Sequence, residues 1–150
     1  MLKGLDPLLT PDILAALRAM GHGDELVVAD ANFPAAAVAR DTVLGEALRL
    51  DGVDLPRAAR AILSVLPLDT FVDRAVLRME VVGEPDTLLP VHQEVQAEVV
   101  RAEGASFPMG TIERMAFYER ARQAYCVIAT GERRPYGDFI FKKGVIPPDA

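Results

Sequence analysis

The stretch that decides the fold runs from Met20 to Pro34 and reads Met-Gly-His-Gly-Asp-Glu-Leu-Val-Val-Ala-Asp-Ala-Asn-Phe-Pro. Its middle part, Leu26 to Ala29, is short, apolar and partly β-branched, which is typical of a strand that is buried on both faces. Asp30 follows this strand directly. Because ligands of open α/β sheets bind at the carboxyl ends of the strands, Asp30 is a candidate site residue.

His22 precedes the same strand and lies between two glycines, Gly21 and Gly23. Glycine permits unusual backbone angles and the close approach of another molecule, and histidine titrates near neutral pH without help. A structural histidine seldom needs glycine on both sides, so His22 is the strongest candidate for proton transfer. Asp30 has an ordinary alternative, which is to close the turn at Asn32 with its carboxylate.

Patterns of apolar residues along the rest of the chain alternate between helical and extended periods. The expected helices are 11–20, 35–40, 55–66, 90–102 and 113–124, and the expected strands are 26–29, 46–50, 74–81, 125–130 and 138–142. Strand 74–81 is expected to be half exposed, with Arg78 on its outer face, and 103–110 is expected to be a loop. The alternation predicts an α/β fold, a single layered domain with a mostly parallel central sheet flanked by helices.

Composition narrows the classes of protein. The 150 residues fit one domain, and no apolar run approaches the roughly eighteen residues that span a bilayer. The 51% of hydrophobic residues must enter a core or contacts between subunits, which favours a homo-oligomer. A net charge of −6 argues against a nucleic-acid surface. No signal peptide is visible at the N-terminus, so a cytoplasmic location is expected.

Several kinds of site are excluded by the residues present. The single cysteine, Cys126, excludes an internal disulfide and a multi-cysteine metal site, and its apolar surroundings indicate a buried hydrophobe. The second histidine, His92, stands among polar residues and is expected to be solvated. The two histidines do not have metal-ligand spacing, and no glycine-rich phosphate loop is present. Acid–base chemistry without a cofactor or metal remains.

Further polar candidates lie near the C-terminal end of the chain. Arg114 and Tyr118 belong to the expected helix 113–124, and the turn at Tyr136, Gly137 and Asp138 opens the last strand. Each has an ordinary alternative, since Tyr118 could be half-buried packing and Tyr136-Gly137 could be a hairpin turn.

Six short stretches of the chain form a recognisable combination. They are Gly-His-Gly-Asp-Glu at 21–25, Ala-Asp-Ala-Asn-Phe-Pro at 29–34, Ala-Phe-Tyr-Glu-Arg-Ala at 116–121, Thr-Gly-Glu-Arg at 130–133, Tyr-Gly at 136–137 and Lys-Lys-Gly-Val at 142–145. Together they resemble the L-fucose mutarotase family, which belongs to the superfamily that also holds D-ribose pyranase. The resemblance runs over nearly the whole chain and is weakest between residues 34 and 110.

The resemblance implies a cofactor-free enzyme that interconverts the anomers of a monosaccharide and assembles as a ring-like homo-oligomer, often a decamer. It implies that His22 is the catalytic histidine. It assigns sugar binding to Asp30, to Arg114 and to the turn Tyr136-Gly137-Asp138. The family usually has Asn where this chain has Asp138, and an ionised carboxylate only accepts hydrogen bonds, so the sugar specificity is open.

Mutarotation needs a proton on the ring oxygen of the sugar and the removal of one from the anomeric hydroxyl. His22 as imidazolium would supply the first, and Tyr118 or Tyr136 would relay the second. Two alternatives stay open: a pyranase that changes ring size by the same ring opening, and a sugar-binding protein without turnover.

Overall fold

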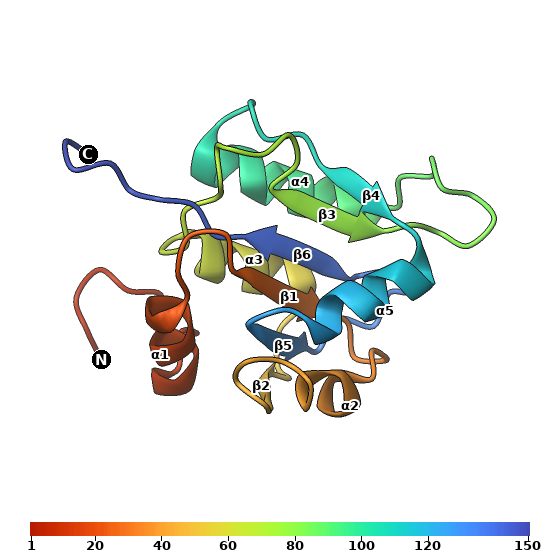
Figure 1. Cartoon of the computed structure of the whole chain (residues 1–150), viewed down its shortest axis with the longest axis horizontal. Coiled ribbons are helices and arrows are strands. Elements are labelled where there is room, and N and C mark those ends of the chain that lie inside the picture. Colours follow the sequence, from red (N-terminus) through yellow and green to blue (C-terminus); the bar gives the residue numbers. More distant parts are fainter.

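A six-stranded sheet runs through the computed structural model, which describes residues 1–150 (Figure 1). In chain order the strands are β1 (Glu25–Ala29), β2 (Ala47–Leu50), β3 (Val76–Met79), β4 (Gly110–Ile112), β5 (Cys126–Thr130) and β6 (Phe139–Lys142), and in space their order is β2-β5-β1-β6-β3-β4. All neighbours are parallel except β6, which is antiparallel to both β1 and β3. The predicted fold class is confirmed.

Helices cover both faces of this sheet. They are α1 (Pro11–Ala19), α2 (Ala35–Ala39), α3 (Leu55–Leu63), α4 (Pro90–Glu103) and α5 (Arg114–Arg122). Helices α1, α3 and α4 pack on one face, while α2 and α5 pack on the other. Side chains at the helix starts satisfy free backbone N–H groups, as when the Thr10 hydroxyl accepts from Ile13 N at 3.2 Å and Asp54 accepts from Arg57 N at 3.0 Å. No helix has the length and apolar character needed to cross a membrane.

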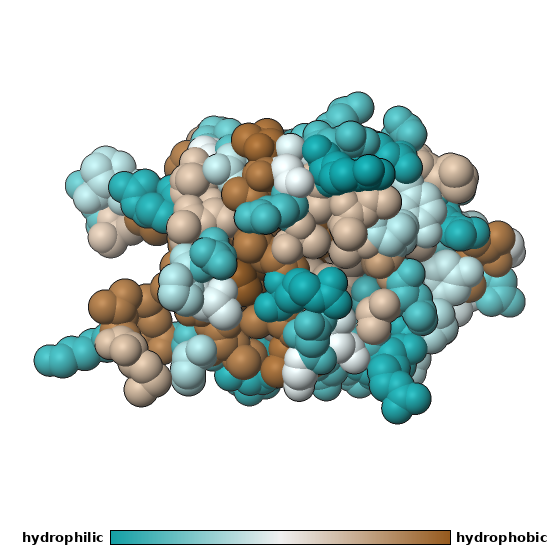
Figure 2. Space-filling model, turned by 90° about the horizontal axis from the view of Figure 1, so that it is seen from below, coloured by the Kyte–Doolittle hydropathy of each residue, from teal (hydrophilic) through white to brown (hydrophobic).

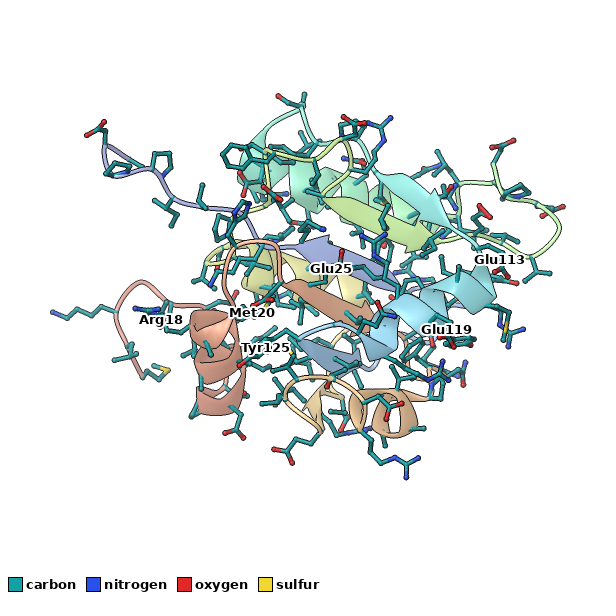
Figure 3. All side chains as sticks on the ribbon, viewed as in Figure 1. Arg18, Met20, Glu25, Glu113, Glu119 and Tyr125 are labelled. Carbon is teal, nitrogen blue, oxygen red and sulfur yellow. The ribbon has the colours of Figure 1, made fainter.

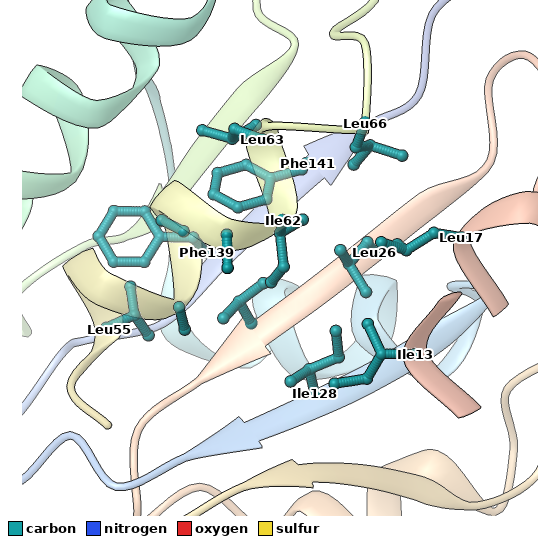
Figure 4. Close-up of a cluster of buried hydrophobic side chains, with 14 of the residues drawn as sticks. Ile13, Leu17, Leu26, Leu55, Ile62, Leu63, Leu66, Ile128, Phe139 and Phe141 are labelled. Atoms are coloured by element: carbon teal, nitrogen blue, oxygen red, sulfur yellow. The ribbon is translucent and has the colours of Figure 1, made fainter. Parts of the chain in front are cut away.

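The larger hydrophobic core lies between the sheet and the helices α1, α3 and α4 (Figure 4). In it, Ile13 of α1 meets the sheet near Leu26 and Ile128, while Ile62 of α3 reaches toward Phe139. Because both faces are covered, β1 and β5 are buried along their length, as the continuous apolar runs predict.

Apolar side chains also reach the surface, among polar ones (Figure 2). Exposed examples include Val43, Phe71, Val82, Met115 and Ile146. The high apolar content therefore fills a core and also leaves apolar side chains available for contacts with other chains.

Two predictions about the sheet are wrong in detail, and one alternative is excluded. Strand 74–81 is not half exposed, because the segment after β3 folds over it and Arg78, only 3% exposed, donates from Nη2 to Pro85 O at 3.0 Å. The end of the expected loop 103–110 opens β4, which pairs with β3. The turn at Tyr136-Gly137 does not close a hairpin, because β1 lies between β5 and β6.

Candidate functional site

A small polar cavity opens at the carboxyl end of β1 and encloses about 260 Å³. Its walls come from the end of β1, the first turns of α5 and the turn before β6. The lining residues are Asp30, Asn32, Phe33, Met79, Arg114, Tyr118, Pro135, Tyr136 and Asp138. Five residues that the sequence singled out thus lie together, although they come from three separate parts of the chain.

Asp30 and Asp138 both line this cavity, and each is only 4% exposed. Because β1 and β6 are antiparallel neighbours, the residue after β1 lies beside the residue before β6. Asp30 N donates to Asp138 Oδ1 at 3.1 Å, and Asp30 Oδ1 accepts from Asn32 N at 2.9 Å. Asp30 therefore closes the turn at Asn32, which is the structural role that the sequence analysis gave as the alternative to a role in the site. Burial, together with the charge of Asp30, raises the pKa of Asp138 well above its usual range.

Arg114 and Tyr118 form the α5 wall of the cavity. They lie one helical turn apart, so Arg114 Nε donates to the Tyr118 hydroxyl at 3.5 Å and the guanidinium lies 5.6 Å from the centre of the ring. The Tyr118 ring also packs against Phe33, with 5.5 Å between ring centres. Tyr118 is therefore half buried and packs against Phe33, as its alternative role required. It also lines the cavity together with the exposed Arg114.

The turn that carries Tyr136, Gly137 and Asp138 is held by a hydrogen bond from another element, helix α4. Tyr136 has a positive φ of 60°, which is uncommon for a residue with a side chain. His92 Nε2 lies 2.9 Å from Tyr136 O, while His92 Nδ1 accepts from Leu89 N at 3.1 Å. Since Nδ1 accepts, Nε2 carries the proton and donates to Tyr136 O.

His92 is fully buried, so the prediction that it is solvated is wrong. Residue His92 follows the start of α4 and points inward, where its ring packs against Phe139 with 5.9 Å between centres. Burial lowers the pKa of His92, with a further contribution from the charge of Arg78, and favours the neutral ring. His92 therefore holds the Tyr136 turn in place.

His22 does not line this cavity, because it precedes β1 and Asp30 follows it. At about 3.3 Å per strand residue, β1 separates the two by roughly 20 Å. In Figure 3, Met20, two residues before His22, lies on one side of the molecule, and Glu113, the residue before Arg114, lies on the other. A single chain therefore does not bring His22 and Asp30 to the same cavity, and their joint role in binding one molecule stays a prediction.

The surroundings of His22 nevertheless resemble those of a proton-transfer group. His22 Nε2 lies 3.0 Å from Asp69 Oδ1, and the side chain of His22 is 45% exposed while that of Asp69 is almost wholly buried. Burial raises the pKa of Asp69, but hydrogen bonds from Phe71 N and His22 outweigh it and hold the pKa below its usual value. The exposed Phe71 ring lies 5.3 Å from the His22 ring. Asp69 thus orients the imidazole.

Glu132 and Cys126 have structural roles. Glu132 is buried, accepts from Leu55 N at 3.2 Å and pairs with Arg134, which also pairs with Glu94. Burial would raise the pKa of Glu132, but the bonds from Arg134 and Leu55 lower it to about 2. Burial raises the pKa of Cys126 to about 12, which keeps the thiol protonated and unreactive.

Sequence reasoning missed Asp69 and misjudged His92. Asp69 stands 47 residues after His22, in a segment with no strand or helix pattern, and nothing local marks it. His92 carried one usable signal, its position in the first turn after Pro90, where a side chain can reach a free backbone N–H. No group of three His, Cys, Asp or Glu side chains is placed to hold a metal ion.

The fold and the cavity define a one-domain α/β protein with a small polar cavity at the carboxyl end of its central strand. Residues 3–146 match the RbsD / FucU transport protein family, so the chain belongs to that family. It is 45% identical to the fucose mutarotase of Bos taurus, over 99% of this chain and 96% of the relative.

Solved structures show the same fold. A structure of fucose mutarotase in complex with L-fucose from Streptococcus pneumoniae superposes with a TM-score of 0.87 at 36% identity, covering 97% of this chain and 100% of the other. A structure described as a putative sugar binding protein superposes with a TM-score of 0.95 at 61% identity, covering 98% of this chain and 97% of the other. The predicted family resemblance is confirmed.

Proposed function

We propose that this chain interconverts the α and β anomers of L-fucose, or of a closely related monosaccharide, by acid–base ring opening. The observation that carries the proposal is the cavity at the end of β1, where carboxyl, guanidinium and phenol groups converge. At about 260 Å³ it is smaller than the pockets of drug-sized ligands, which suits one sugar ring. The names of the relatives at 36–45% identity, fucose mutarotase, favour the same reaction.

The reaction requires one proton donor and one proton acceptor. A proton goes to the ring oxygen, the bond from the anomeric carbon to the ring oxygen breaks with its electron pair on that oxygen, and the anomeric hydroxyl loses its proton to leave an aldehyde. Rotation of the aldehyde and reversal of these steps closes the ring on the other face. We assign the ring-oxygen proton to His22 and the anomeric proton to Tyr118 or Tyr136.

Asp69 determines which nitrogen of His22 takes part. Because the Asp69 carboxylate accepts from Nε2–H at 3.0 Å, Nδ1 is the nitrogen free to take up and release a proton. Asp69 is therefore a positioning residue. Arg114, Asp30, Asp138 and the backbone at Gly137 bind the sugar hydroxyls in this assignment.

The distance of His22 from the cavity leads to a site shared between copies of the chain. We propose a ring-like homo-oligomer, a decamer by resemblance, in which His22 of one copy faces the cavity of the next. Both halves are bordered by exposed apolar side chains, Phe71 beside His22 and Met115 beside Arg114, which an interface would bury. The cytoplasmic location expected from the sequence stays a prediction.

Magnetisation-exchange NMR on equilibrated L-fucose tests the function by following transfer between the α and β anomeric protons. The protein should accelerate exchange, and His22→Ala should lose about 10² to 10⁴ of the acceleration while it stays folded. Arg18→Ala is the matched control. Arg18 lies near Met20, on the side of the molecule that carries His22 (Figure 3), and it is exposed and takes part in no ion pair. If exchange with the protein were equal to exchange in buffer alone, the proposed function would be refuted. If His22→Ala kept full activity, His22 would not be the proton donor.

Repeating the measurement with D-ribose, and determining the ring size of the product, separates this reaction from that of a pyranase. A protein that binds L-fucose without accelerating exchange would instead be a sugar-binding protein.

A further inference from the structure

Two carboxyl groups that line the cavity, those of Asp30 and Asp138, have no cationic side chain paired with them. Asp30 and Asp138 are almost wholly buried and lie side by side, joined by the bond from Asp30 N to Asp138 Oδ1. Neither takes part in any of the ion pairs of the structure. Such neighbours are costly when both are ionised, since each loses water and each repels the other.

The charged and titratable groups around the pair do not supply the missing charge. From α5, Arg114 donates to Tyr118 rather than to either carboxyl group. From β3, the buried Arg78 donates from Nη2 to Pro85 O rather than to either carboxyl group. From α4, His92 is neutral and bonded to the backbone of the Tyr136 turn.

Two further groups adjoin the pair from the turn before β6. Glu132 is satisfied by Arg134 and is itself negative, so it cannot offset another carboxylate. The Tyr136 hydroxyl accepts from Val82 N at 3.3 Å, and a phenol cannot supply a positive charge. No cationic side chain of the chain therefore pairs with either carboxyl group.

We propose that Asp30 and Asp138 hold a single proton between them, with Asp138 as the carboxylic acid and Asp30 as the carboxylate, and that this acid–carboxylate pair is what recognises two hydroxyl groups of the bound sugar. This rests on the proposed function. A carboxylic acid donates one hydrogen bond and a carboxylate accepts, so together they serve a diol. With one negative charge on the pair and one positive charge on Arg114, the cavity is balanced for a neutral ligand.

The direction of the pH effect follows from the proton. Loss of the shared proton at higher pH leaves two adjacent carboxylates, which cannot donate to a sugar hydroxyl. Affinity for L-fucose should fall by about tenfold per pH unit above the titration of the pair, as linkage requires for one proton. Asp138→Asn keeps a donor and an acceptor without a proton to lose, so its affinity should not follow that fall.

Stability gives a readout that needs no sugar. The folded state prefers protonated Asp138, so its free energy of unfolding falls as pH rises from the unfolded-state pKa of about 3.9 through the higher folded-state pKa. Asp138→Asn lacks this fall. Its folding equilibrium constant relative to the original protein should therefore grow with pH, by up to about tenfold per pH unit.

The experiment measures urea unfolding and L-fucose affinity of the original protein and of Asp138→Asn across pH, with the infrared band of a protonated carboxylic acid as a direct check. We expect the band in the original protein at neutral pH and its loss in Asp138→Asn. Absence of the band, or a stability difference that does not grow with pH, would overturn the shared proton. If the band and the stability difference appear but no sugar binds, the proton pair stands and the proposed function fails.

Discussion

Gly137→Ala is expected to destabilise the protein and to disturb the cavity together. A Cβ added at Gly137 would lie 2.9 Å from Glu132 Cγ and 3.4 Å from Asp30 Cβ. The first distance is about 0.6 Å shorter than the closest favourable separation of two carbon atoms, about 3.5 Å. Glu132 is poorly placed to move, because its carboxylate accepts from Leu55 N at 3.2 Å and from Arg134 N at 2.9 Å.

Overpacking of this kind costs about 1–3 kcal/mol, which corresponds to a fall in Tm of about 2–12 °C for a chain of this length. If the turn shifts away from Asp30 to relieve the contact, the affinity for L-fucose also falls. Thermal unfolding with and without L-fucose measures both, at one protein concentration because the Tm of an oligomer depends on it.

Gly52→Ala is the matched control, since a Cβ at Gly52 meets nothing within 4 Å. It should stay within about 0.5 kcal/mol of the original protein. A Gly137→Ala variant as stable as Gly52→Ala would refute the close packing of the turn against Glu132.

Two further predictions concern the groups around the cavity. His92→Leu leaves Leu89 N and Tyr136 O without their partner, which should cost about 1–3 kcal/mol at pH 7. Because burial lowers the pKa of His92, the original protein should lose stability as the pH falls below about 6.5. His92→Leu should lack this loss. Urea unfolding of the two proteins at pH 7 and pH 5 measures the cost of the substitution and the pH effect. The pKa of Glu132 is lowered from 4.5 to about 2 in the folded state, so its ionised carboxylate stabilises the fold above pH 4.5. This stabilisation is lost as the pH falls from 4.5 toward 2. Glu132→Gln should therefore be less stable than the original protein at pH 7, and the difference should vanish in acid unfolding curves near pH 2. If a variant and the original protein showed the same dependence of stability on pH, the role given to the substituted residue would be contradicted.

The elements of the fold could be predicted because local signals agreed with tertiary packing. The predicted helices 11–20 and 55–66 do begin at residues 11 and 55, where Thr10 and Asp54 cap them, and the apolar run 26–29 lies within the central strand β1. Arg78 shows where this reasoning fails, because an alternating pattern predicts which face a side chain takes but not what covers that face. The covering segment, 80–89, has no periodic pattern of its own.

The candidate site could be predicted in part. Asp30 and Asp138 were found because both adjoin strands of the sheet, and the carboxyl end of β1 brings them together. The separation of His22 from Asp30 follows from the same rule, since a residue before a strand and a residue after it lie at opposite ends of that strand. Asp69 was not predictable, because only the folded chain brings it to His22.

The central claim, a sugar site formed by the cavity of one copy and His22 of the next, is tested by mixing two inactive variants. His22→Ala keeps the cavity and Arg114→Ala keeps the histidine, so the two are unfolded and refolded together and L-fucose exchange is measured. If each site takes one part from each of two copies, a random mixture in equal amounts should recover about a quarter of the original activity. A mixture that stays as inactive as its two parents would contradict the shared site.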